Sequence, residues 1–81
     1  MDRYKVAIVD DDELSLDNLA FGLQKFEDFH VEGTARNGAS GKKLIAKVHP
    51  DLLFLDVELP DMRGMDLLDS IRESLTWDMK V

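Results

Sequence analysis

The sequence predicts an α/β fold: a doubly wound parallel sheet in which strands and helices alternate. Two short apolar runs, at residues 5–9 and 52–55, each end in acidic residues, and a further strand is predicted between them at residues 30–35; segments of helical periodicity separate the three. Continuous apolar runs are typical of strands that are covered on both faces, as in a parallel sheet. With strand order 2-1-3, the ends of strands one and three would be neighbours in the crevice where ligands bind.

The first predicted strand leads into a capped helix. Asp10, Asp11 and Asp12 follow the strand directly. Asp12 is placed to accept hydrogen bonds from the first turn of a helix predicted over residues 13–26. Apolar side chains recur in this helix at spacings of three and four residues: Leu16, Leu19, Ala20 and Leu23. That spacing predicts a helix that packs its apolar face on the sheet.

The second predicted strand, residues 30–35, contains Gly33, which weakens the strand signal. Asn37 and Gly38 are typical turn residues, and a second helix follows them. The predicted inner face of this helix is made of small and apolar residues: Gly41, Leu44, Ile45 and Val48. We expect the helix to end near Pro50, because the residue before a proline disfavours helical geometry.

The third predicted strand, residues 52–55, is followed by a loop over residues 57–63 that contains Pro60. A third helix comes after the loop. Its predicted buried side is entirely aliphatic: Leu67, Leu68, Ile71 and Leu75. Residues 79–81 begin another apolar segment.

Composition limits the possible classes of protein. A chain of 81 residues forms one domain at most, and its 33% charged residues are too interspersed with apolar ones to indicate disorder. The net charge of -7 excludes the basic footprint of a nucleic-acid-binding surface. The absence of cysteine excludes disulfides and thiolate metal sites. No apolar stretch approaches the roughly 20 residues of a membrane span, so we expect no membrane association and a cytoplasmic location.

Several of these residues together carry a family resemblance. The acidic run follows the first strand, Asn37-Gly38 follows the second, and Asp56 follows the third, with Pro60 and Gly64 four and eight residues later. In this order the set resembles the receiver domain of two-component response regulators. The resemblance implies a flavodoxin-like (CheY-like) doubly wound sheet with strand order 2-1-3.

The resemblance also implies the site residues and their partners. Asp56 would be the phosphoacceptor, taking a phosphoryl group from a sensor histidine kinase. Asp10, Asp11 and Asp56, with the backbone carbonyl of Glu58, would bind Mg²⁺. An aspartate attacks a phosphoryl group only when the negative charge at the site is neutralised, and Mg²⁺ prefers oxygen ligands of this kind. By the same resemblance, the chain would be a signalling module and not an enzyme.

The resemblance covers about the N-terminal two-thirds of a receiver. We expect residues 1–81 to form one incomplete domain that stops after the third helix, with strands four and five missing. Strand three would then be an apolar edge that a dimer partner or a swapped segment covers, or else the chain is the ordered part of a longer polypeptide. Residues 56–62 are also similar to receivers joined to LytTR-type DNA-binding domains, although a local phrase does not identify the output domain that is expected in the intact protein.

Alternatives remain open for the same residues. The acidic run alone is also typical of a helix N-terminus. A metal-dependent phosphotransferase or phosphatase of another α/β family would also use a strand-end aspartate nucleophile. Such enzymes typically need a second aspartate two residues later, where this chain has Glu58. A pseudo-receiver that only mediates protein contacts is the third possibility.

The remaining polar and aromatic residues are interpreted more simply. Three acids are expected to be solvated loop and helix-start side chains and not metal ligands: Glu58, Asp61 and Asp66. Neither His30 nor His49 is expected to be a phosphodonor. Trp77 is interpreted as a packing residue or as part of an interface.

Overall fold

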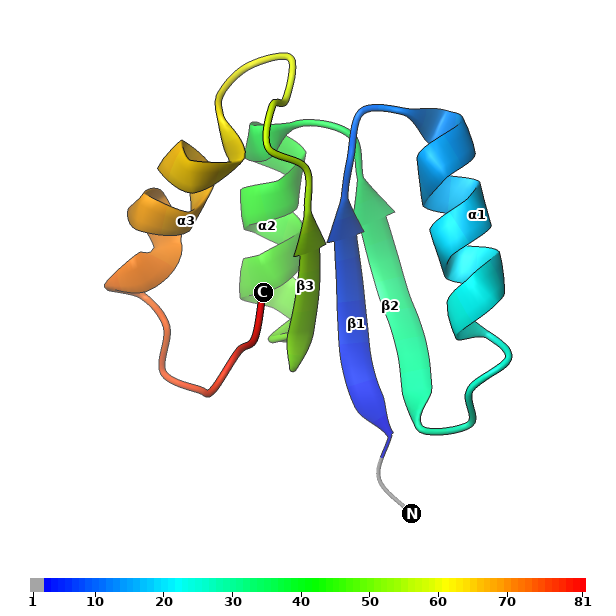
Figure 1. Cartoon of the computed structure of the whole chain (residues 1–81). Helices are drawn as coiled ribbons and strands as arrows, with labels where there is room; N and C mark the ends of the chain where they lie inside the picture. Colours follow the sequence, from blue (N-terminus) through cyan, green and yellow to red (C-terminus); the bar gives the residue numbers. More distant parts are fainter. Residues whose placement is uncertain (1–2) are drawn as a thin grey trace.

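The computed structural model describes residues 3–81 and shows a three-stranded parallel sheet with three helices (Figure 1). The strands are β1 (Tyr4–Val9), β2 (Phe29–Ala35) and β3 (Leu52–Leu55), and the helices are α1 (Glu13–Leu23), α2 (Gly38–Val48) and α3 (Gly64–Arg72). The strand order is β2-β1-β3, which confirms the predicted fold class and the 2-1-3 order. Among the described residues, no helix has the length and apolar content needed to cross a membrane.

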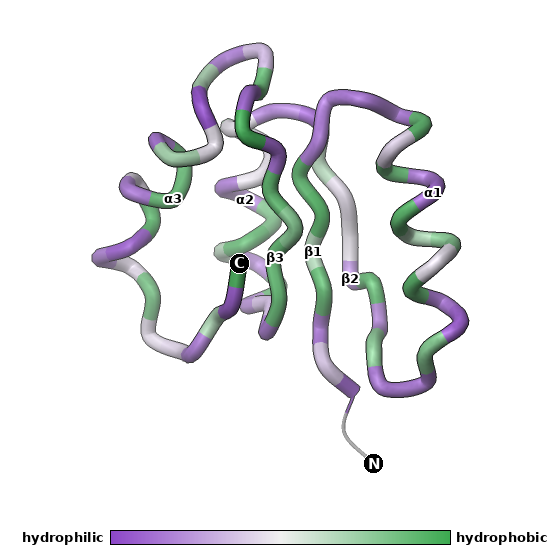
Figure 2. The backbone as a smooth tube through the Cα atoms, in the orientation of Figure 1, coloured by the Kyte–Doolittle hydropathy of each residue, from purple (hydrophilic) through white to green (hydrophobic). Residues whose placement is uncertain are grey.

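Strand β1 lies at the centre of the sheet and is buried on both faces. Val6 and Ile8 pack with α1 in one hydrophobic cluster. Ala7 and Val9 pack with α2 and α3 in a second cluster. Because successive side chains of a strand point to opposite faces, the sheet forms the middle of three layers. Figure 2 shows hydrophobic colour along β1 and β3 and hydrophilic colour in the segment that joins β1 to α1.

Helix α1 ends at Leu23, and the prediction that it continues to residue 26 was wrong. The apolar stripe of the helix stops at Leu23, so no further side chain holds another turn on the sheet. Phe26 is 59% exposed and meets the Phe29 ring edge to face, with the ring centroids 6.2 Å apart. Phe26 therefore helps to close the turn into β2 instead of extending the helix.

Strand β2 begins at Phe29, one residue before its predicted start, and contains a bulge. Its pairing with β1 shifts by one residue, which leaves Glu32 without a partner on β1. At the adjacent Gly33, an added Cβ would lie 2.7 Å from Cδ1 of Leu44 in α2. The missing side chain thus allows α2 to approach the sheet closely. Bulge and glycine together explain the weak strand signal of this segment.

Helix α3 carries only part of its predicted apolar face. Leu67 and Ile71 are buried against the sheet and α2. Leu75 was predicted on the same face, but α3 ends at Arg72. After Arg72 the chain forms a tight turn, in which the Leu75 N–H donates to the Arg72 carbonyl at 3.3 Å. This change of direction brings Trp77 back toward the end of α2.

The aromatic ring of Trp77 holds the segment after α3 to the C-terminus of α2. Trp77 stacks on His49, with the ring centroids 4.0 Å apart and an interplanar angle of 6°. Its Nε1–H also donates to the Pro50 carbonyl at 2.7 Å. His49 itself ends α2 in the left-handed conformation, with φ of 49°. Helix α2 therefore stops where Pro50 predicts, and Trp77 is a packing residue of this domain.

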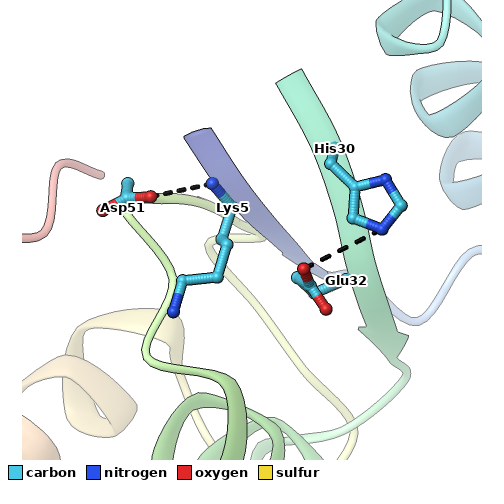
Figure 3. A network of polar contacts seen from close by, with 4 residues as sticks. All are labelled: Lys5, His30, Glu32 and Asp51. Carbon is cyan, nitrogen blue, oxygen red and sulfur yellow. Dashed lines mark hydrogen bonds and ion pairs between the residues drawn. The ribbon is translucent and has the colours of Figure 1, made fainter. Parts of the chain in front are cut away.

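The outer edge of β3 is partly occupied by the chain itself. The Lys80 N–H donates to the Asp51 carbonyl at 3.0 Å, and the Leu53 N–H donates to the Lys80 carbonyl at 2.7 Å. On the inner side of β3, Asp51 Oδ2 accepts the Lys5 N–H at 2.8 Å (Figure 3). Residues 79–81 therefore begin a further parallel pairing, as their apolar character predicts. Coverage of the remaining edge by a partner chain stays a prediction.

Candidate functional site

The carboxyl ends of β1 and β3 lie in register, and this places their acidic residues side by side. Val9 and Leu55, the last residues of the two strands, are paired. The Asp56 N–H donates to the Val9 carbonyl at 2.9 Å. The Asp10 N–H donates to the Ala35 carbonyl of β2 at 3.0 Å. The sheet therefore fixes the backbone of both acidic residues.

Three of the predicted site residues come together at this edge. Carboxylate oxygens of Asp10, Asp11 and Asp56 lie within 4.8 Å of one another. Asp10 and Asp56 are partly buried, and Asp11 is exposed. Three carboxylates this close repel one another unless a cation or hydrogen-bond donors compensate their charge. The arrangement is therefore suited to a positively charged ligand.

The third acid of the run, Asp12, has a different role. Its Oδ1 accepts the Leu14 N–H at 3.2 Å, and its Oδ2 accepts the Ser15 hydroxyl at 2.8 Å. Asp12 is thus the N-cap of α1, as the sequence predicts. The Asp12 N–H in turn donates to Oδ1 of Asp10 at 3.0 Å, so one Asp10 oxygen orders the turn between β1 and α1.

The chemistry and spacing of the three carboxylates fit Mg²⁺. This ion takes oxygen ligands at about 2.0–2.1 Å in octahedral geometry, so two of its ligand oxygens lie about 2.9–4.2 Å apart. The carboxylate oxygens lie within 4.8 Å of one another, which is close to that range. Anionic oxygen donors also favour a hard cation over a softer metal.

Glu58 lines the same open depression as Asp11 and Asp56. The other residues of the depression follow Asp56 in the chain: Val57, Leu59 and Pro60. Glu58 also forms an antiparallel bridge with Arg63, so the loop folds back on itself. The role of the Glu58 carbonyl as a metal ligand stays a prediction.

Gly64 permits a close backbone approach beside Asp56. A Cβ at Gly64 would overlap the Asp56 carbonyl oxygen and would lie 3.2 Å from Cγ of Leu55. Gly64 has no positive φ, so the requirement for glycine is one of space and not of backbone conformation. The spacing of eight residues between Asp56 and Gly64 thus has a physical reason: the start of α3 packs directly on the end of β3.

Asp61 is the main site feature that sequence reasoning missed. Its Oδ1 accepts the Gly38 N–H at 2.6 Å, and its Oδ2 accepts the Ala39 N–H at 3.0 Å. The hydrogen bonds from Gly38 and then Ala39 lower the pKa of the Asp61 carboxyl below its ordinary value. Asp61 is an exposed loop acid and lies outside the carboxylate cluster, as predicted, but its two hydrogen bonds to the start of α2 were not predicted. No local signal could have found this contact, because Asp61 and Gly38 lie 23 positions apart in the sequence.

Arg36 brings a positive charge next to the acidic cluster. Its Nη2 donates to the Asp11 carbonyl at 3.2 Å. Arg36 was not among the predicted site residues. Its position directly after β2, at the same edge of the sheet as the acids, is the signal that could have found it.

Fold and site together define a class: a doubly wound α/β domain with an acidic cluster at the carboxyl edge of its central strands. The family follows from comparison with known proteins. The chain belongs to the response regulator receiver domain family, whose model matches residues 6–81. This result agrees with the resemblance carried by Asp56, Pro60 and Gly64.

Curated relatives include regulators and enzymes of greater length. The chain is 38% identical over 64 residues to the transcriptional regulatory protein BtsR of Escherichia coli (strain K12), covering 79% of this chain and 27% of that protein. It is 42% identical over 67 residues to protein-glutamate methylesterase/protein-glutamine glutaminase 2 of Koribacter versatilis, covering 83% of this chain and 18% of that protein. The chain therefore spans about a quarter or less of the length of these relatives.

Solved structures show the same fold. The response regulator domain of Thermotoga maritima CheB superimposes with a TM-score of 0.84 at 25% identity, covering 88% of this chain and 53% of that one. The signal receiver domain of the putative response regulator NarL from Mycobacterium tuberculosis gives a TM-score of 0.86 at 27% identity, covering 91% of this chain and 60% of that one. The likeness thus extends over most of the described chain.

Proposed function

We propose that this chain is the phosphoacceptor part of a response regulator and that Asp56 receives the phosphoryl group from a phosphohistidine of a sensor histidine kinase. The observation that carries this proposal is the convergence of Asp10, Asp11 and Asp56 within 4.8 Å at the ends of two paired strands. Membership of the receiver family supports it.

The proposed reaction is an in-line transfer between two side chains. A carboxylate oxygen of Asp56 attacks the phosphorus, the bond from phosphorus to the kinase histidine nitrogen breaks, and an aspartyl phosphate forms. Asp10 and Asp11 would hold Mg²⁺ together with Asp56 and the Glu58 carbonyl. When bound, Mg²⁺ supplies the positive charge that offsets the carboxylates and the phosphoryl oxygens.

Asp56 is the best placed acceptor of the three acids. Asp10 already uses Oδ1 to accept the Asp12 N–H, at 3.0 Å. Asp56 lines the open depression together with Asp11, and its backbone is fixed to Val9 of β1. A carboxylate that lines an open depression is accessible to the imidazole of another protein. These surroundings support Asp56 as the nucleophile, with Asp10 and Asp11 as its partners in holding Mg²⁺.

The proposal extends to the protein that contains this chain. We propose that residues 1–81 are the N-terminal part of one receiver domain, because they cover 53% and 60% of the two receiver structures compared above. An output domain, of a DNA-binding kind as the transcriptional relative favours, would respond to phosphorylation in the cytoplasm. The chain itself would act stoichiometrically and not as a turnover enzyme, although one relative is named as an esterase.

Intact-mass spectrometry tests the phosphoacceptor role. The chain is incubated with Mg²⁺ and acetyl phosphate, alone and within the longer receiver that we propose, beside Asp56→Asn and a control, Asp66→Asn. We expect one added phosphate in the unaltered protein and in the control, none in Asp56→Asn, and none without Mg²⁺. Equal labelling of Asp56→Asn would show that another residue accepts the phosphoryl group. No labelling of the longer receiver would favour the contact-only alternative, and multiple turnover of an added phosphate ester would favour the enzyme alternative.

A further inference from the structure

The loop after Asp56 is fastened to a helix that contributes no acid to the cluster. The Asp61 carboxylate accepts the N–H groups of Gly38 and Ala39, the first two residues of α2, at 2.6 and 3.0 Å. The next N–H, that of Ser40, donates to the Asn37 side chain at 2.8 Å. The N-terminus of α2 is therefore capped by two side chains, one from its own turn and one from the β3–α3 loop.

Electrostatic attraction stabilises this contact in addition to the two hydrogen bonds. The N-terminal end of a helix carries partial positive charge, and a carboxylate placed there is stabilising. Helix α2 has no acidic residue in its own first turn. Asp61 supplies that negative charge from a distant part of the chain. The contact is thus a charge-assisted clamp between α2 and the loop.

The loop is a closed unit, so that fixing one part of it fixes the rest. The Leu59 N–H donates to the Met62 carbonyl at 2.9 Å, and the Gly64 N–H donates to the Val57 carbonyl at 2.8 Å. Leu59 is buried in the core that includes Val9. These hydrogen bonds and the buried Leu59 side chain hold the turn together.

A second contact aligns the same loop on α2. The Met62 side chain occupies the space where a Cβ of Gly38 would lie. Met62 thus packs on the residue whose N–H binds the Asp61 carboxylate. Two adjacent loop residues, one charged and one apolar, hold the loop at a single place on the helix, and this fixes both its position and its orientation.

We propose that Asp61 is a positioning residue for phosphoryl transfer: by binding the N-terminus of α2, it holds the closed loop so that the Glu58 backbone faces Asp11 and Asp56. Asp61 lies three residues after Glu58 and touches none of the reacting groups, so it acts through the loop backbone. This inference rests on the proposed function, since it assigns Asp61 to the same metal and phosphoryl site. A consequence is that Mg²⁺ binding and the N-terminus of α2 are coupled.

Four variants of the full chain separate this role from simpler effects. Asp61→Ala removes both hydrogen bonds, and Asp61→Asn keeps one acceptor and is the milder change if the alanine variant unfolds. Asn37→Ala removes the other cap of the same helix but leaves the loop attached. Asp66→Asn removes one negative charge near the same loop without touching α2. Mg²⁺ affinity is measured by NMR titration, and amide hydrogen exchange is measured without metal.

We expect Asp61→Ala to weaken Mg²⁺ binding by on the order of tenfold, the lower range for groups that orient metal ligands, and Asp61→Asn to weaken it less. Asn37→Ala and Asp66→Asn are expected to stay within about twofold of the unaltered chain. In the unaltered chain, Mg²⁺ should shift the amide signals of Gly38 and Ala39. The labelling rate with acetyl phosphate should fall in parallel with Mg²⁺ affinity.

Two results would overturn the inference: unchanged Mg²⁺ affinity in Asp61→Ala, or an equal loss in Asn37→Ala, which would place the effect in α2 and not in the loop. Failure of the proposed function is distinguishable, because the unaltered chain itself would then take up no phosphate or bind no Mg²⁺. In that case the metal-free exchange decides the positioning role. Faster exchange at Val57 and Glu58 in Asp61→Ala but not in Asn37→Ala would support it, and equal exchange would overturn it.

Discussion

Lys5 and Asp51 bind each other twice, through the backbone and through a side chain. The Asp51 N–H donates to the Lys5 carbonyl at 2.8 Å, and the Lys5 N–H donates to Oδ2 of Asp51 at 2.8 Å (Figure 3). This pair precedes the first paired residues of the ladder, Val6 and Leu52. The double contact therefore fixes the register that later brings Asp56 beside Asp10.

Replacing Asp51 with alanine should destabilise the chain. The substitution leaves the partly buried Lys5 N–H without its charged acceptor, a loss of about 1.5–3 kcal/mol in the free energy of unfolding. Asp51→Asn retains an acceptor oxygen and should lose less. Urea denaturation of both variants measures the difference. An alanine variant as stable as the unaltered chain would contradict a role for this side chain in setting the register.

Gly64→Ala should destabilise the chain by about 1–3 kcal/mol, the usual cost of forcing extra volume into a packed site. The added methyl group would overlap the Asp56 carbonyl oxygen, so β3 and α3 must separate. Gly22→Ala is the matched control, because a Cβ at Gly22 would meet no atom within 4 Å. In helix α1 the same change should be neutral or stabilising by up to about 1 kcal/mol. Equal unfolding midpoints for the two variants would contradict the close-approach argument.

The features that could be predicted from the sequence are those with a local signal. The apolar runs predict β1 and β3, and the acids at the ends of these strands predict the convergence of Asp10, Asp11 and Asp56. Parallel strands have one polarity, so the order of the strands is enough to bring these acids to one edge.

The features that could not be predicted depend on contacts between distant residues. The Asp61 carboxylate binds backbone N–H groups of another element, and such groups are present at every helix N-terminus whatever its sequence. The turn after Arg72 is likewise determined by the place where Trp77 meets Pro50. Helical periodicity carries no information about either contact, so the predicted third helix extended too far.

Mg²⁺ should stabilise the folded chain, and the gain should increase as the Mg²⁺ concentration rises above the Kd. At a Mg²⁺ concentration ten times the Kd, the expected gain is about 1.4 kcal/mol, because only the folded state holds the carboxylates together. For a domain of this size the gain corresponds to a rise in Tm of roughly 6–11 °C.

Asp11→Asn should lose this gain. Without metal, the same variant should be more stable than the unaltered chain, because one of three mutually repelling charges is gone. Calorimetry with Mg²⁺ and with EDTA would show the reversal, and a variant that is less stable in both conditions would contradict it.

The contribution of Asp61 to stability should disappear in acid. Its pKa is lowered in the folded chain by the Gly38 and Ala39 N–H groups, whereas the unfolded value is about 3.9. The unfolded state therefore takes up the proton more readily, so the stabilisation is complete above the unfolded pKa and is lost as the pH falls through the lower, folded pKa. Asp61→Asn should be less stable than the unaltered chain at pH 7, and the difference should shrink below about pH 4. Urea midpoints measured from pH 7 to pH 3 test this. A difference that stays constant with pH would show that ionised Asp61 is not what holds the loop to α2.

His49 is subject to two opposing effects that a double-mutant cycle can separate. Its left-handed backbone, with φ of 49°, costs about 1–2 kcal/mol for a residue with a side chain. Its stack on Trp77, with the ring centroids 4.0 Å apart, contributes about 0.5–1.5 kcal/mol.

His49→Gly relieves the backbone strain and removes the stack, so its net effect should be within about 0.5 kcal/mol of zero. In a Trp77→Ala background the stack is already absent, and His49→Gly should then stabilise the chain by about 1 kcal/mol. Equal effects of His49→Gly in the two backgrounds would show that the stacked rings contribute no coupling energy.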